Sequence, residues 1–202
     1  MTHTFALTFD YLCPFARNAN EFVLTALSGG ADFAVTFTPF SLSAGHAPDG
    51  CDTFFADPKN DRASGIQALL AGLTVRDQYP EAFAAVHGAL FAARHDDGKD
   101  LKDVDVIKDV LTRCDVDAAA VFHHIASGEP KAVLTREHRE NQHTHQVWGV
   151  PTVITDARAV FVRLMDRPTA DTSAAAERIR LIVDLVNSPV ALHEFKQVDL
   201  PQ

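Results

Sequence analysis

A long helical segment separates two groups of strand-like sequence, and this order limits the folds open to the chain. Residues 4–12 and 33–40 alternate larger apolar with small or polar side chains, as half-buried strands do. Residues 152–155 and 159–164 have the same character and are joined by a short turn, which predicts a hairpin. Residues 61–146 show helical spacing instead. Because this segment is far longer than an ordinary connection, it is expected to form a layer of its own.

The helix boundaries are indicated by residues that start or stop helices. Pro14 suits the first helical position, where its missing N–H costs nothing, and the Gly pair after Ser28 ends that helix. Asp117 is expected to cap a later helix, and residues 43–60 are expected to be a loop because they are rich in Gly, Pro, Asp and Asn. The remaining helices are predicted near residues 61–73, 78–95, 101–114, 117–127, 130–146 and 173–186.

This order of elements predicts an α/β fold with a mixed sheet, because one hairpin lies beside a strand–helix–strand unit. Residues 1–57 and 147–202 are expected to form one domain, and residues 58–146 an inserted helical domain.

Composition narrows the classes of function. The chain has 202 residues and is 47% hydrophobic, so it can bury a core. Its formal net charge is −9. The negative charge argues against general nucleic-acid binding and against adhesion to an anionic membrane. The first residues show neither a secretory signal nor a membrane span, which favours the cytoplasm. Three cysteines, odd in number and far apart, are expected to remain free in that compartment.

Cys13 is the candidate reactive residue. It ends the first strand-like run and precedes Pro14, so its sulfur is expected at the start of a helix. Backbone N–H groups of Phe15 and Ala16, together with the helix dipole, favour a thiolate there and are expected to lower the pKa of Cys13. The alternative is a buried structural cysteine. Ala16 occupies the position where a redox motif would carry a second cysteine, so no local disulfide can form.

The segments Asp10-Tyr11-Leu12-Cys13-Pro14-Phe15 and Trp148-Gly149-Val150-Pro151-Thr152, separated by a helical insertion, resemble the DsbA-like branch of the thioredoxin superfamily. The resemblance implies a thioredoxin-like mixed sheet with a large helical insertion. It also implies that the Val150–Pro151 bond is cis and that the backbone beside it pairs with the substrate near the reacting sulfur. The implied site therefore comprises catalytic Cys13, with Tyr11, Pro14, Phe15, Val150 and Pro151 contacting the substrate.

The resemblance implies a cytoplasmic thiol–disulfide oxidoreductase with one catalytic cysteine. A small thiol such as glutathione would be its co-substrate, and no bound cofactor is expected. Cys51 or Cys114 could instead resolve a mixed disulfide. Kappa-type glutathione transferases and 2-hydroxychromene-2-carboxylate isomerases are similar in architecture and usually have serine where this chain has Cys13. A third alternative is a non-catalytic redox sensor.

Several neighbouring residues have open roles. Asp10 is either a proton relay or a strand-end carboxylate, and its charge would raise the pKa of Cys13. Tyr11 is expected either to line a substrate groove or to pack in the core. Cys51 is interpreted as an exposed loop thiol. The histidine spacing does not fit a metal site, so the histidines, His138 among them, are expected to be solvated and no metal is predicted.

Overall fold

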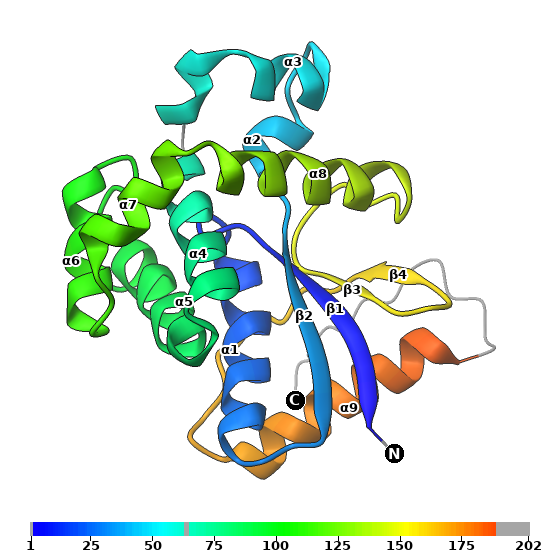
Figure 1. Ribbon diagram of the computed structural model, residues 1–202. Coiled ribbons are helices and arrows are strands. Elements are labelled where there is room, and N and C mark those ends of the chain that lie inside the picture. The colour runs from blue at the N-terminus through cyan, green and yellow to red at the C-terminus, as the bar shows by residue number, and fades with distance from the viewer. Residues whose placement is uncertain (1, 63–64, 189–202) are drawn as a thin grey trace.

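The computed structural model describes residues 2–62 and 65–188 and contains a four-stranded sheet surrounded by helices (Figure 1). Residues 189–202, the end of the predicted 147–202 segment, lie outside the described residues. The strands are β1 (His3–Phe9), β2 (Phe33–Pro39), β3 (Thr152–Ile154) and β4 (Ala159–Phe161). The helices are α1 (Pro14–Ser28), α2 (Leu42–Gly45), α3 (Gly50–Ala56), η1 (Pro58–Arg62), α4 (Ile66–Gln78), α5 (Pro80–His95), α6 (Val104–Arg113), α7 (Ala118–Ala126), α8 (Glu129–His143) and α9 (Thr172–Asn187).

The sheet is mixed, as the sequence predicts. Its strand order is β2-β1-β3-β4, in which β1 and β2 are parallel and the β1–β3 and β3–β4 pairs are antiparallel. Phe5 lies opposite Val35, and Leu7 lies opposite Val153. The hairpin β3–β4 therefore extends the sheet from the side of β1, and it brings the chain around residue 150 back to the end of β1.

Helices α1 and α9 pack together against one side of the sheet (Figure 1). The apolar layer between them includes Leu7 of β1, Val23 of α1 and Val183 of α9, all nearly inaccessible to solvent. Such a layer of buried aliphatic side chains is the main favourable contribution to folding.

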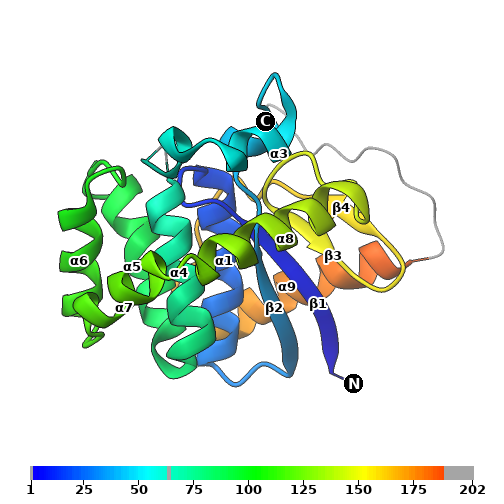
Figure 2. The same cartoon turned by 45° about the horizontal axis from the view of Figure 1, so that its top comes forward.

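The inserted helices contact both α1 and the sheet. Helix α5 packs on α1, and α8 contacts β2. The Asn141 side-chain amide of α8 donates hydrogen bonds to the Thr38 hydroxyl and the Pro39 carbonyl of β2. Figures 1 and 2 both show α4–α7 on the same side of the view as α1, away from the β3–β4 hairpin, and α5 is the helix that packs on α1. The insertion therefore buttresses the helix that begins at Cys13.

Residues 43–60 differ from the sequence prediction. The expected loop contains most of α2, all of α3 and part of η1. The Ser41 hydroxyl accepts a hydrogen bond from the Ala44 N–H and caps α2, which is a short-range signal hidden in a Gly- and Pro-rich composition. By contrast, Asp117 caps α7 as expected, since its carboxylate accepts from the N–H groups of Ala119 and Ala120. No helix within residues 2–62 and 65–188 is long and apolar enough to cross a membrane.

Candidate functional site

Cys13 lies at the N-cap of α1, directly after the bend that follows β1. Pro14 is the first residue of the helix, and the Cys13 sulfur accepts a hydrogen bond from the Ala16 N–H at 3.4 Å. On its other side the Cys13 S–H donates to the carbonyl oxygen of Val150, also at 3.4 Å. The sulfur therefore joins the start of the helix to the segment that precedes β3.

The ionisation of Cys13 differs from the sequence prediction. Burial raises the pKa of Cys13 above its ordinary value and outweighs the N–H groups of Ala16 and Phe15, which lower it. Cys13 is only 7% exposed, and its hydrogen bond to the Val150 carbonyl requires the protonated thiol. The expectation of a thiolate stabilised by the helix N-terminus was wrong, because desolvation opposes the anion more strongly than two N–H groups support it.

The segment Val150–Pro151 contributes a backbone carbonyl to the site. The peptide bond between these residues is cis, and both residues are buried. The Thr152 N–H donates to the Thr8 hydroxyl of β1 at 2.8 Å, and the Thr152 hydroxyl donates to the Gly149 carbonyl. These bonds hold the loop against the end of β1, where Cys13 begins α1.

Asp10 lies beneath the site without exposed surface. Its carboxylate accepts hydrogen bonds from the Leu12 N–H at 2.9 Å and from the Leu42 N–H at 2.8 Å. Burial raises the pKa of Asp10 to about 6, although both N–H groups lower it. When ionised, Asp10 raises the pKa of Cys13, as the sequence suggested. Asp10 thus ties the Cys13 loop to the segment after β2.

A line of aromatic rings and one cation borders the site, and two of its members, Phe161 and Arg163, were not predicted from the sequence. The Arg163 guanidinium carbon lies 5.1 Å from the Phe15 ring centroid and 5.2 Å from that of Phe161. The Phe161 ring is in turn 4.6 Å from the Trp148 ring. We call Trp148, Phe161, Arg163 and Phe15 the rim. Its members are distant in sequence, so only the predicted hairpin could have suggested that β4 returns to Cys13.

The other predicted site residues divide between surface and core. Pro14 is exposed and Phe15 is half-buried, so both can be reached from solvent. Tyr11 has no exposed surface, and its hydroxyl bonds to His87 Nδ1 at 2.9 Å. Tyr11 therefore belongs to the core, and the prediction that it contacts the substrate was wrong, because its side chain presents no surface to a ligand.

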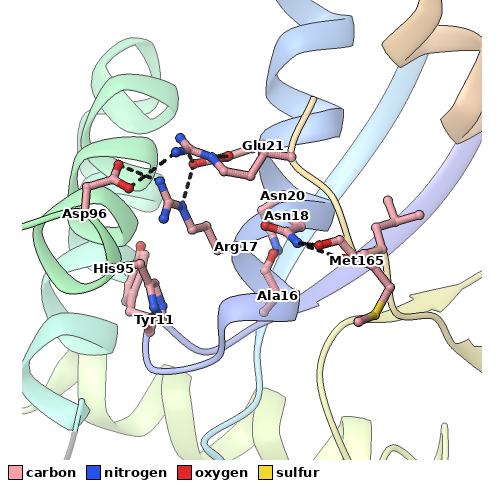
Figure 3. Close-up of polar contacts among 11 residues, drawn as sticks. Tyr11, Ala16, Arg17, Asn18, Asn20, Glu21, His95, Asp96 and Met165 are labelled. Carbon is pink, nitrogen blue, oxygen red and sulfur yellow. Dashed lines mark hydrogen bonds and ion pairs between the residues drawn. The ribbon is translucent and has the colours of Figure 1, made fainter. Parts of the chain in front are cut away.

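An ion-pair cluster lies one helical turn beyond Cys13 (Figure 3). The Arg17 guanidinium donates to Glu21 at 2.8 Å and to Asp96 at 2.5 Å, and Arg167 pairs with the same two carboxylates. Nearby, the Asn18 amide donates to the carbonyls of Leu164 and Met165. These contacts join α1 to the end of α5 and to the chain after β4. The two carboxylates also neutralise the charge of Arg17.

The other cysteines are free, and they lie on α3 and at the end of α6. Cys51 is 5% exposed on α3, so the expectation of an exposed loop thiol was wrong. Burial raises the pKa of Cys51, and Asp52 raises it further. Cys114 is half-buried at the C-terminal end of α6, and burial raises its pKa as well.

His138 also differs from expectation, because it is fully buried rather than solvated. It stacks on Phe40 with 4.4 Å between ring centroids, and its Nδ1 accepts from the Ser41 N–H. Burial lowers the pKa of His138 to about 4. Within the described ranges, no group of three or more His, Cys, Asp or Glu side chains could hold a metal ion.

Comparison with known proteins gives one family and many structures. The model of the DSBA-like thioredoxin domain matches residues 6–173 of this chain. A search of curated protein sequences finds no match.

Three of the similar structures differ in activity. Reduced DsbA1 from Neisseria meningitidis is 18% identical with a TM-score of 0.58, covering 91% of this chain and 83% of its own. The cytosolic disulfide reductase DsbM from Pseudomonas aeruginosa, solved with GSH, is 15% identical with a TM-score of 0.61, covering 90% and 99%. A 2-hydroxychromene-2-carboxylate isomerase is 17% identical with a TM-score of 0.60, covering 90% and 98%. The matches confirm the predicted thioredoxin-like fold class.

Proposed function

Because the chain belongs to the family of DSBA-like thioredoxin domains, we propose that it is a thiol–disulfide oxidoreductase that works with Cys13 alone. Family membership supports an enzyme of thiol–disulfide type. The observation that carries the single-cysteine proposal is the geometry of the Cys13 sulfur. It lies between the Ala16 N–H and the Val150 carbonyl, and Ala16 stands where a second thiol would be needed for a local disulfide.

The proposed reaction removes a small thiol from a mixed disulfide. The Cys13 thiolate attacks the small-thiol sulfur of the mixed disulfide, an S–S bond to Cys13 forms, and the protein substrate leaves as a thiolate that takes up a proton. A second small-thiol thiolate then attacks the small-thiol sulfur bound to Cys13. The small disulfide leaves, and the Cys13 thiolate is regenerated, so electrons and sulfur atoms balance.

Substrate binding has to activate Cys13, because the buried thiol is protonated at rest. In the resting protein the Val150 carbonyl accepts the S–H of Cys13. A substrate N–H that takes this carbonyl would remove the acceptor that favours the thiol. The Ala16 N–H would remain to stabilise the thiolate. Pro14, Phe15, Val150 and Pro151 are the proposed substrate contacts. Reactivity would then depend on binding more than on a permanently low pKa.

Glutathione or an equivalent small thiol is the proposed co-substrate. The similar reductase DsbM was solved with GSH, which supports this choice. A monothiol cycle needs a continuous supply of reduced thiol, so the proposed compartment is the reducing cytoplasm.

The test is turnover of a glutathionylated peptide by reduced glutathione, followed by mass spectrometry. Wild type is compared with Cys13→Ser, Cys51→Ser and Cys114→Ser. Only Cys13→Ser should abolish turnover, and a Cys13–glutathione disulfide should accumulate when free glutathione is withheld. Loss of turnover in Cys51→Ser or Cys114→Ser instead would assign resolution to that thiol. The single-cysteine mechanism would then be wrong.

One observation favours a second candidate, a transferase or isomerase that binds a small-thiol conjugate without disulfide exchange. The raised pKa of the buried Cys13 suits a thiol that donates a hydrogen bond better than one that attacks. The similarity to an isomerase supports this candidate. Conjugating or isomerising activity that survives in Cys13→Ser would favour it over the oxidoreductase. If peroxide oxidised Cys13 and no substrate was turned over, the protein would instead be a redox sensor.

A further inference from the structure

Arg163 is the charged member of the rim. Its guanidinium lies over the rings of Phe15 and Phe161, and Phe15 follows Cys13 by two residues. This arrangement restrains a long side chain that is otherwise exposed to solvent. Because the rings contact the guanidinium group through its π-system, the N–H groups at the edge of the plane can still donate hydrogen bonds to a ligand.

The charge of Arg163 has no acidic counterion within residues 2–62 and 65–188. Arg17 and Arg167, which also lie near the start of α1, are both paired with Glu21 and Asp96. The positive charge of Arg163 interacts electrostatically with the Cys13 sulfur and acts to lower the pKa of Cys13, against the larger effect of burial. An exposed guanidinium held beside a nucleophilic sulfur without an internal counterion is suited to an external anion.

We propose that Arg163 determines the specificity of the Cys13 site by binding the carboxylate of an acidic thiol or disulfide. This inference rests on the proposed function, because it assigns the class of compound that reacts at Cys13. Guanidinium and carboxylate match in shape and form paired N–H···O hydrogen bonds, so a carboxylate is a better partner than a diffuse anion. The carboxylate belongs either to a small thiol or to an acidic side chain next to the disulfide of a protein substrate.

The first experiment measures Cys13 modification in a single turnover. Two aromatic disulfides are used, dianionic dithiobis(nitrobenzoic acid) and neutral dithiodipyridine, with peptide mapping to isolate the Cys13 rate. In Arg163→Gln the rate with the dianionic reagent should fall roughly tenfold, as expected for loss of a charge-assisted hydrogen bond. The rate with the neutral reagent should fall by less than about twofold. A change in the thiolate fraction of Cys13 scales both rates alike, so their ratio reports how strongly the site favours the anionic reagent.

Arg178→Gln is the matched control. Arg178 is also exposed and also lies over a phenyl ring of α1, but that ring is Phe22, which is more than two helical turns from Cys13. The control removes the same charge and should leave the ratio of the two rates unchanged. Arg163→Lys should recover part of the selectivity, since it restores the charge but not the planar group.

A second experiment distinguishes the two sources of the carboxylate. Cys13 loaded with glutathione is reduced by mercaptopropionate, mercaptoethanol or cysteamine, which carry negative, zero and positive charge. In parallel, a glutathionylated peptide with acidic flanking residues is compared with the same peptide in which Asn or Gln replaces those residues. Loss of selectivity among the small thiols in Arg163→Gln assigns the site to the small thiol. Loss only between the two peptides assigns it to the protein substrate.

The proposal is overturned if Arg163→Gln slows both aromatic disulfides equally, or if Arg178→Gln changes their ratio as much. Failure of the proposed function gives a different result. In that case charge selectivity at Cys13 would persist in the single-turnover assay, while no glutathionylated peptide would be turned over.

Discussion

Asp10 and Tyr11 follow β1 as neighbours, and neither has exposed surface. Asp10 accepts two backbone N–H groups, one from Leu12 and one from Leu42, and burial raises its pKa to about 6. Tyr11 instead contacts His87 and the inserted helices, and burial raises its pKa far above the ordinary range. Equal burial therefore leaves one group able to titrate near the physiological range and keeps the other neutral.

Tyr11, His87 and Asn20, which we call the Tyr11 side, form an unbroken series of hydrogen bonds between uncharged side chains. The Asn20 amide oxygen can only accept, so His87 Nε2 carries the proton that it donates to Asn20. His87 Nδ1 then accepts from the Tyr11 hydroxyl, and the Asn20 amide nitrogen donates to the Ala16 carbonyl. Every polar atom of this series has a partner, and the series ends at the first turn of α1. Its role is to support the helix that carries Cys13.

We expect changes on the Tyr11 side to alter the stability of the protein, whereas a change at Asp10 should also alter the pKa of Cys13. The largest effect is expected for His87→Ala. It removes a ring packed against Phe9, Phe83 and Phe91 and leaves two buried hydrogen-bonding partners unpaired. The cost should be about 3–5 kcal/mol in the free energy of unfolding. Urea denaturation measures it, with the exposed His123→Ala as control. A loss below about 1 kcal/mol would contradict the proposed support role.

Asp10→Asn should change the pH dependence of stability. A folded-state pKa raised from 3.8 to about 6 means that the unfolded chain loses its proton first as pH rises, so wild type loses stability across this window. The amide can accept only one of the two N–H groups, so the variant should be less stable at low pH. That deficit should shrink by about 2 kcal/mol between about pH 4 and pH 7, as measured by urea denaturation.

Exposed Asp156→Asn is the control, because it makes the same carboxylate-to-amide change at a surface position. Asp10→Asn should also lower the pKa of Cys13, because the ionised carboxylate raises it. The pH dependence of Cys13 alkylation reports this change. An unchanged alkylation profile would mean that Asp10 only positions the backbone.

Gly72→Ala tests how tightly the Tyr11 side is packed. A Cβ at Gly72 would overlap the Tyr11 hydroxyl oxygen and press on its ring. Overpacking of this kind should destabilise the protein by about 1–3 kcal/mol. The double variant with Tyr11→Phe should cost less than the sum of the two single variants, because the overlapping oxygen is gone. Strict additivity in a thermal or urea unfolding cycle would show that the two residues do not interact.

The sequence predicted the parts of this arrangement that depend on local signals. The strand before Cys13, Pro14 at the start of α1 and the β3–β4 hairpin follow from alternation and helix-start residues. What it could not predict arises from contacts between distant segments. The Val150 carbonyl that accepts from Cys13 and the ring stacking of Arg163 both require the hairpin to return to α1. The protonated state of Cys13 followed from neither Pro14 nor the helix, because burial is a property of the assembled core.

Tyr11→Phe should have the smallest effect and separates the two sides most cleanly. It removes one hydroxyl, leaves His87 Nδ1 without its donor and retains the His87–Asn20–Ala16 bonds. The cost should be about 1–2 kcal/mol in unfolding free energy. The rate of Cys13 exchange at pH 7 should stay within about twofold of wild type, since no bond to Ala16 is broken. If exchange slowed tenfold or more while stability was retained, Tyr11 would act on Cys13 directly. The division between a titrating side at Asp10 and a supporting side at Tyr11 would then fail.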